Sequence, residues 1–243
     1  MIRASLVTLT TIVVLASSLS QASAQLFPSL VQSDPFDGLA GGGQQPGHAG
    51  LVGKRYLEAR YLHLRTDDSS GFDESFQGFD VTFNTPLPWT DQLVPGLGMD
   101  VFIDYARLTA SDSAGGLSAD FTGHAIEGGI TLHAAFGSPV RPFVQVGAVH
   151  TIGEIEIGLP GGTISLDDDS TQVLARPGVE ADIASNMSLR AMLDIETEEQ
   201  FDESIASAEL IAWLNNNAYL RAGVFVPLHT EDIGFAVGGG LSF

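Results

Sequence analysis

The sequence has no cysteine and few basic residues, since ten Lys and Arg stand against thirty Asp and Glu in 243 residues, for a formal net charge of −20 at pH 7. Without cysteine the chain forms no disulfide framework and no metal or nucleophilic site based on a thiolate. The acidic balance argues against a nucleic-acid partner, because binding to phosphate backbones requires a basic surface. A solvated, exported surface fits this composition better.

Long hydrophobic runs are also missing, apart from one near the N-terminus. Residues 1–24 are typical of a secretory signal peptide, with Arg3 in a short basic region, an apolar stretch over 6–19 and a small-residue cleavage site, Ala22-Ser23-Ala24. The alternative, an uncleaved anchor helix, falls short of the roughly 20 apolar residues that span a bilayer. We therefore expect the mature chain to be soluble outside the cytoplasm or to enter a membrane as strands.

Residues 25–50 are rich in Gly, Pro and Gln and show little periodicity. This composition predicts a flexible lead-in without packed structure. A short plug or a contact on the peptidoglycan side is the functional alternative. The remaining residues, 51–243, form the second part of the mature chain.

Ten segments within 51–243 alternate apolar with polar or small residues, which is the period of a strand with unlike faces. Short connections follow the even segments, except for the long connection 86–95 after the second one, and longer connections, such as 110–118 and 153–170, follow the odd segments. This arrangement predicts an all-β, closed antiparallel barrel of ten strands, with eight as the alternative. The expected strands are 54–65, 76–85, 97–109, 119–134, 140–152, 171–184, 187–197, 204–214, 218–227 and 232–243.

Charged residues gather on one face of these strands, as Arg176 and Glu180 do on one segment and Arg190 and Asp194 on the next. Unpaired charges are very costly in an ordinary core, so this face is either wet or a paired lumen. The opposite face is apolar and would meet lipid. The first segment fits least well, because Leu62 shares a face with Glu58 and Arg60.

At this point the chain resembles the small outer-membrane β-barrel family, the OmpA-like transmembrane domains. The segment V-E-A-D-I-A-S-N-M-S-L-R-A (179–191) is similar to that family's strand, short turn and strand with an inward Glu and Arg. The chain end is similar to its C-terminal aromatic assembly signal, with Gly239 in place of the usual apolar residue; the matching residues are Phe235, Val237, Leu241 and Phe243. The resemblance implies a place in the Gram-negative outer membrane, with membrane lipid and the barrel-assembly machinery as partners.

Hairpin register predicts which charges meet. A three-residue turn at 184–186 would set Ile183 across from Met187, and then Glu180 faces Arg190. A two-residue slip would instead set Asp182 across from Arg190, so opposite charges meet in either register. On the next hairpin, Ile211 would face Arg221 with Glu209 one diagonal step away. We expect these charges to fill the lumen as salt bridges, leaving at most a narrow, cation-preferring passage; the expected lumen network is Glu180, Arg190, Arg176, Asp194, Glu209 and Arg221.

Candidate chemistry outside this face is weak. The six histidines are scattered without metal-binding spacing, and the acidic clusters at 67–68, 167–169, 198–199 and 202–203 lack the order of a calcium loop. We therefore expect no cofactor and no metal site, with cation bridging between acidic outer loops as the alternative to solvated charge. His150 and Thr151, with Glu154 nearby, allow a hydrolase acting on outer-leaflet lipid as a further alternative.

The sequence therefore predicts a non-enzymatic outer-membrane barrel with a structural, adhesive or narrow-passage role. A secreted, soluble calycin-like barrel that binds a small hydrophobic ligand is the main rival, because alternation alone does not decide which face meets water.

Overall fold

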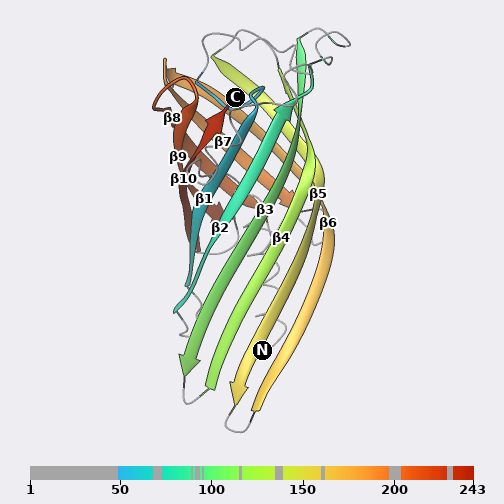
Figure 1. Cartoon of the computed structure of the whole chain (residues 1–243), viewed down its shortest axis with the longest axis vertical. Helices are drawn as coiled ribbons and strands as arrows, with labels where there is room; N and C mark the ends of the chain where they lie inside the picture. Colours follow the sequence, from blue (N-terminus) through green and yellow to red (C-terminus); the bar gives the residue numbers. More distant parts are fainter. Residues whose placement is uncertain are drawn as a thin grey trace.

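The computed structural model describes residues 49–67, 73–88, 90, 94, 96–114, 117–134, 139–159, 162–196, 204–228 and 232–243, and these form one closed antiparallel barrel (Figure 1). The described residues contain no helix of the length and hydropathy needed to cross a membrane. The signal peptide and residues 25–48 of the lead-in lie outside the described residues. The strands are β1 (Tyr56–Asp67), β2 (Asp73–Pro86), β3 (Leu97–Ala114), β4 (Leu117–Ala134), β5 (Val140–Leu159), β6 (Gly162–Ala184), β7 (Met187–Glu196), β8 (Ile205–Trp213), β9 (Ala218–Pro227) and β10 (Ile233–Ser242).

The barrel closes through its first and last strands. β1 pairs with β10 from Tyr56 opposite Ser242 to Arg65 opposite Ile233, and with β2 on its other side. Closure satisfies the backbone N–H and C=O groups that an open edge would leave bare, each at a cost of several kcal/mol in hydrocarbon. The predicted closed barrel of ten strands is confirmed, and the alternative of eight is wrong.

The strands differ in length, and the difference gives the barrel two unlike ends. β3 to β6 have 18 to 23 residues, whereas β7 to β10 have nine or ten. In Figure 1 the long strands run past their neighbours toward the bottom, which we call the outer end, while the C-terminus lies at the top, the inner end. β3 to β6 therefore form a four-stranded sheet that projects from the barrel.

This projection corrects the prediction of loops at 110–118 and 153–170. Apart from the connections at 115–116 and 160–161, which are outside the described residues, both regions are strand. Glu154 pairs with Asp167 and Glu156 with Ser165, so exposed polar residues here occupy ladder positions. Beyond the outer end of the barrel both faces of the sheet meet solvent, so the apolar alternation that marks the barrel strands is much weaker there.

The two faces of the barrel differ as predicted. Ile103, Val173 and Val237 point outward and are about half exposed, whereas the inner face holds most strand charges in buried positions. The mixed inner face of β1, on which leucines follow charged residues, is explained by an apolar layer inside the barrel, toward the outer end. Leu62 and Leu64 belong to this inner apolar cluster, together with Phe76, Ala106, Leu108, Phe121, Ala125, Val149, Ile205, Phe225 and Ala236.

The hairpin between β6 and β7 contains one correction. Its turn has two residues, Ser185 and Asn186, and Met187 pairs with Ala184 instead of Ile183. A bulge between Asp182 and Ala184 takes up the extra residue, so the ladder beyond it returns to the predicted register. Glu180 therefore lies directly across from Arg190, as predicted.

Candidate functional site

The charged part of the lumen is built around Glu180 on β6. Its Oε2 accepts hydrogen bonds from Arg190 Nη2 at 2.9 Å and Nε at 3.2 Å, and its Oε1 accepts one from Arg141 Nε at 3.3 Å. β5, β6 and β7 are neighbours, so alternate residues of these strands aim the three side chains into one space. Glu180 is fully buried, and its charge is balanced by two guanidinium groups.

A second group lies deeper in the barrel and is centred on Arg176. Its Nη1 and Nη2 donate to the two carboxylate oxygens of Glu127 at 2.7 and 2.8 Å, and its Nε donates to Asp194 Oδ2 at 2.9 Å. The fork-like contact with Glu127 has the bidentate geometry that favours arginine over lysine. Because Glu127 is on β4 and Arg176 on β6, this pair reaches past β5.

A third group is centred on Glu209 of β8. Arg60 Nη1 donates to its Oε1 at 2.8 Å, and Arg221 Nη2 donates to its Oε2. Arg221 also donates to Glu58 at 3.3 Å, and Arg60 to Asp80 at 3.3 Å. Ile211 lies across from Arg221, as predicted, so Glu209 reaches Arg221 along the diagonal. These contacts join β8 and β9 to β1 and β2.

The structure thus places all six residues of the expected lumen network on the inner face with 3% or less of their surface exposed; these are Glu180, Arg190, Arg176, Asp194, Glu209 and Arg221. They fall into three groups, each completed by further charged side chains. The added partners are Glu58, Arg60, Asp80, Glu127, Arg141 and Asp182. Pairs across the lumen could not be found from hairpin register, which relates only neighbouring strands.

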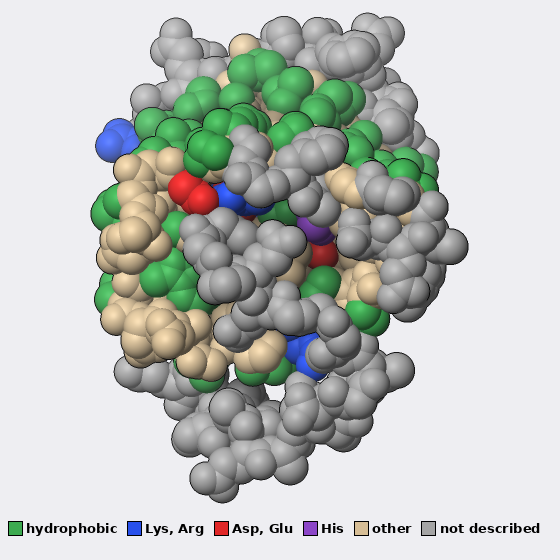
Figure 2. Space-filling view, turned by 90° about the horizontal axis from the view of Figure 1, so that it is seen from above, with side chains coloured by type: hydrophobic (Ala, Val, Ile, Leu, Met, Phe, Trp, Pro, Cys, Tyr) green, Lys and Arg blue, Asp and Glu red, His purple; other side chains and the backbone are tan. Residues whose placement is uncertain are grey.

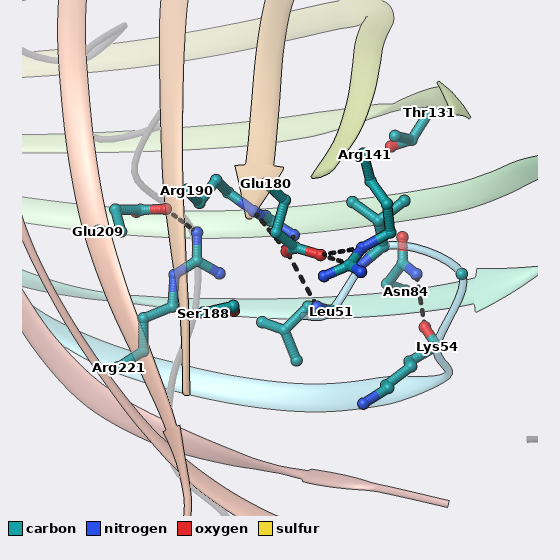
Figure 3. Close-up of polar contacts among 12 residues, drawn as sticks. Leu51, Lys54, Asn84, Thr131, Arg141, Glu180, Ser188, Arg190, Glu209 and Arg221 are labelled. Carbon is teal, nitrogen blue, oxygen red and sulfur yellow. Dashed lines mark hydrogen bonds and ion pairs between the residues drawn. The ribbon is translucent and has the colours of Figure 1, made fainter. Parts of the chain in front are cut away.

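A short backbone segment crosses the inner mouth of the barrel, and we call residues 49–54 the inner strap. Its Leu51 and Val52 amides donate to Glu180 at 2.9 and 3.4 Å (Figure 3). At its two ends, the Ala49 amide donates to Asp182 and the Gly53 amide to Asp100, at 3.0 and 2.9 Å. The strap therefore binds carboxylates on both sides of the mouth.

Side chains hold the strap from the opposite direction. The Ala49 carbonyl accepts hydrogen bonds from Ser188 Oγ at 3.1 Å and Trp213 Nε1 at 2.6 Å. Leu51 packs in a small apolar cluster with Tyr56, Ile211 and Tyr219, and it has no exposed surface. Ala49 and Gly50 are buried, although the sequence analysis assigned them to an unpacked lead-in.

Figure 2 looks onto this inner end of the barrel. Acidic, basic and histidine side chains are visible near its centre.

Lys54 ends the strap and is the only lysine in the chain. Its Nζ lies 4.0 Å from the centre of the Trp213 ring, a cation–π distance. Burial lowers the pKa of Lys54 to about 8, although the nearby Glu180 carboxylate opposes the shift. The ammonium charge at this position is therefore easily lost.

The residues considered for hydrolysis are not brought together. Thr151 points into the barrel and bonds with Ser170 at 2.7 Å, whereas His150 points outward and its Nδ1 lies 2.9 Å from Thr171 Oγ1. Neighbouring residues of a strand face opposite sides of a sheet, so this pair has no common site.

Metal ligands are not clustered either. Within the described ranges, no three His, Asp or Glu side chains are grouped so as to hold a metal ion. The acidic residues at 167–169 lie exposed on β6, and those at 198–199 and 202–203 are outside the described residues.

Comparison with solved structures identifies the class of fold. The transport unit of the autotransporter AIDA-I from Escherichia coli matches with a TM-score of 0.54 at 9% identity, over 88% of this chain and 94% of that one. The attachment invasion locus protein Ail of Yersinia pestis (TM-score 0.41, 14% identity, 79% and 99% coverage) and outer membrane phospholipase A from Escherichia coli (0.36, 11%, 77% and 89%) also match. The match to the AIDA-I transport unit shows that the two chains share a closed β-barrel fold, the fold class that the resemblance implied.

Sequence comparison adds nothing to this assignment, because no model of a known protein family matches the chain and no curated protein matches it.

Proposed function

We propose that this protein is a non-enzymatic outer-membrane barrel whose lumen is sealed and whose projecting sheet of β3 to β6 is displayed at the cell surface. The observation that carries the proposal is the division of the barrel into an apolar outer face and an inner face on which all five buried arginines are paired with carboxylates. A membrane protein of this kind needs an apolar band about 25 Å tall around its outside. Outward-pointing Ile103, Val146 and Val237 are part of such a band.

The inner face supports a seal made of three layers. The strap lies across the inner mouth, the three charged groups fill the middle, and the inner apolar cluster occupies the side toward the outer end. Ten strands enclose only a little more space than the eight that side chains fill completely. A soluble calycin-like barrel would need an apolar cavity inside for its ligand, and the charged middle layer fits that function poorly.

The projecting sheet supports a role at the surface. β5 continues for nine residues beyond His150, which at about 3.3 Å per residue is roughly 30 Å along the strand. The exposed side chains here include Glu154, Glu156 and Asp167 to Asp169. An acidic sheet raised above the lipid is suited to contacts with other surfaces, and it is joined to the barrel by unbroken strands.

Single-cysteine variants test the location and the orientation of the barrel in one experiment, because the chain has no cysteine of its own. Ser165→Cys lies on the projecting sheet and Asn216→Cys on an exposed turn at the inner end. In intact cells a membrane-impermeant maleimide should label only Ser165→Cys, and the protein should fractionate with outer membranes and show heat-modifiable gel migration. Recovery in the soluble periplasm, or labelling of Asn216→Cys alone, would reject the proposal.

A further inference from the structure

The outward face of β3 to β6 changes character in a fixed order along the strands. On β4 it runs from Ile126 through His124 and Thr122 to the exposed Asp120, and on β5 from Ala148 through His150 and the exposed Ile152 to Glu154. On each strand a histidine follows the apolar side chains, and acidic side chains begin only beyond it. The change from apolar to acidic side chains marks the region in which the apolar band ends.

Arg107 lies at this level on β3, directly across from His124. His150 is a diagonal neighbour of His124, because His124 pairs with Ile152 on the adjacent strand. Diagonal neighbours on one face of a sheet are about 7–8 Å apart, within reach of long side chains. We call Arg107, His124 and His150 the outer girdle.

The stagger of the strands keeps the girdle level. If the paired residues are followed from His63 through β2, β3, β4 and β5, the path reaches Asp167 on β6. If they are followed the other way round the barrel, through β10, β9, β8 and β7, the path reaches Val179 on β6, which is 12 residues from Asp167. Around ten strands this stagger amounts to about 1.2 residues per strand. From Arg107 to His124 there is no step, and from His124 to His150 the step is two residues toward the inner end, an average of one residue per strand. The three residues therefore lie close to one level of the barrel.

Both histidines are held in place by hydroxyl groups. His124 Nδ1 lies 2.8 Å from the Tyr105 hydroxyl, and His150 Nδ1 lies 2.9 Å from Thr171 Oγ1. When the hydroxyl donates to Nδ1, the proton of the neutral ring sits on Nε2. Nε2 is then a donor, on the same face as the guanidinium of Arg107, which is exposed.

Arg107 and Arg65 are the two exposed arginines on the described strands, and Arg65 lies on β1, two strands away from Arg107. The five arginines at 60, 141, 176, 190 and 221 are buried inside the barrel, and Arg55 lies at the inner end. The exposed charged residues of β4 to β6 beyond the girdle are acidic and would repel anions; they are Asp120, Glu154, Glu156 and Asp167 to Asp169. We propose that the outer girdle binds the phosphate groups of glycolipids in the outer leaflet, an inference that rests on the proposed membrane location.

Arginine and two imidazole N–H groups are a suitable donor set for a phosphate, because guanidinium pairs with its oxygens in a bidentate manner. Lipid is the source of the phosphate, since the girdle borders the apolar band where lipid headgroups lie. Binding fixes the height of the barrel in the membrane and keeps the acidic sheet above the headgroups.

The test compares unfolding temperatures in three bilayers: phosphatidylcholine alone, with added diphosphorylated lipid A, and with added dephosphorylated lipid A. The phosphorylated lipid should raise the unfolding temperature of the wild type and the dephosphorylated lipid should not. The triple variant Arg107→Gln/His124→Gln/His150→Gln should lose this increment. Arg55→Gln, which removes one charge at the opposite end, should keep it.

Outcomes separate the two proposals. If the barrel inserts and is heat-modifiable in every bilayer, but its unfolding temperature is not raised by the phosphorylated lipid, the proposed phosphate binding is overturned and the proposed function remains intact. An equal increment in the triple variant, or an increment from inorganic phosphate in phosphatidylcholine alone, also overturns it. Failure to insert into any bilayer overturns both.

Discussion

At the scale of single residues, the inner face depends on pairing five arginines with carboxylates. Each of Arg60, Arg141, Arg176, Arg190 and Arg221 lies within 3.3 Å of at least one carboxylate oxygen. Removing these ions from water is unfavourable, and the interaction of each arginine with its carboxylate offsets this desolvation free energy. Removing one partner is therefore more harmful than removing an exposed charge.

Arg190 offers the direct comparison. Arg190→Ala leaves Glu180 with Arg141 and the strap amides only, and we expect it to lower the free energy of unfolding by about 3–5 kcal/mol. Arg65→Ala removes an exposed arginine and should cost no more than about 1 kcal/mol. Unfolding in detergent followed by heat-modifiable migration measures both. Equal losses would mean that the Glu180 group adds no more stability than a surface charge.

Lys54 predicts a pH effect. Its pKa in the folded state is lowered to about 8 from 10.5, so folding disfavours the charged form. Stability should therefore rise as pH increases between these two values, because the unfolded chain binds more protons there. Trp213 reports the change: in a Trp89→Phe background its fluorescence should titrate near pH 8, and Lys54→Met should abolish the transition. A midpoint above pH 10 in the wild type would contradict the burial of Lys54.

At the scale of elements, the strap depends on a residue without a side chain. A Cβ at Gly50 would overlap the Glu180 carboxylate, so Gly50→Val should release the strap. Val52→Cys, which is buried in the parent, should then react with a maleimide from the inner side. Gly162→Val makes the same change at a position with nothing within 4 Å and should leave Val52→Cys protected. Equal protection in both variants would show that the strap tolerates displacement of Glu180.

The last strand is predicted to act during assembly. Phe243 is 41% exposed, and its amide donates to the Arg55 carbonyl at 3.3 Å, a contact that a smaller residue keeps. Phe243→Ala should lower the yield of inserted barrel while the unfolding temperature of the inserted fraction stays near that of wild type. Phe79→Ala, an outward aromatic on β2, is the control and should leave yield unchanged. Wild-type yield of Phe243→Ala at native expression would refute the assembly role of the residue.

Local sequence patterns predicted the strands and the pairing of residues on neighbouring strands. Alternation identified the ten strands and the inward Glu180 and Arg190, and the Asn-rich turn fixed Ile211 opposite Arg221. Contacts between residues far apart in the sequence could not be predicted from these patterns. Leu51 and Glu180, for example, are separated by 129 positions, and no periodicity relates them. The projecting strands were also missed, because a sheet wetted on both faces lacks the strong apolar alternation of the barrel strands.

At the scale of the whole molecule, the structure combines a closed wall with an interior filled by charge pairs, an apolar cluster and the strap. Acidic side chains outnumber basic ones on the inner face, where Glu58, Asp80, Asp100, Asp104, Glu127, Glu180, Asp194 and Glu209 are buried beside five arginines. Any residual leak through the barrel should therefore prefer cations over anions.

Conductance of the purified wild-type protein in planar lipid bilayers tests the seal most directly. The filled interior predicts no large or stable current steps, and at most a small cation-preferring leak. Insertion is verified in the same preparation by heat-modifiable migration, so a silent bilayer cannot be confused with absent protein. Large, long-lived steps of the porin type would show that the lumen is open and would contradict the account.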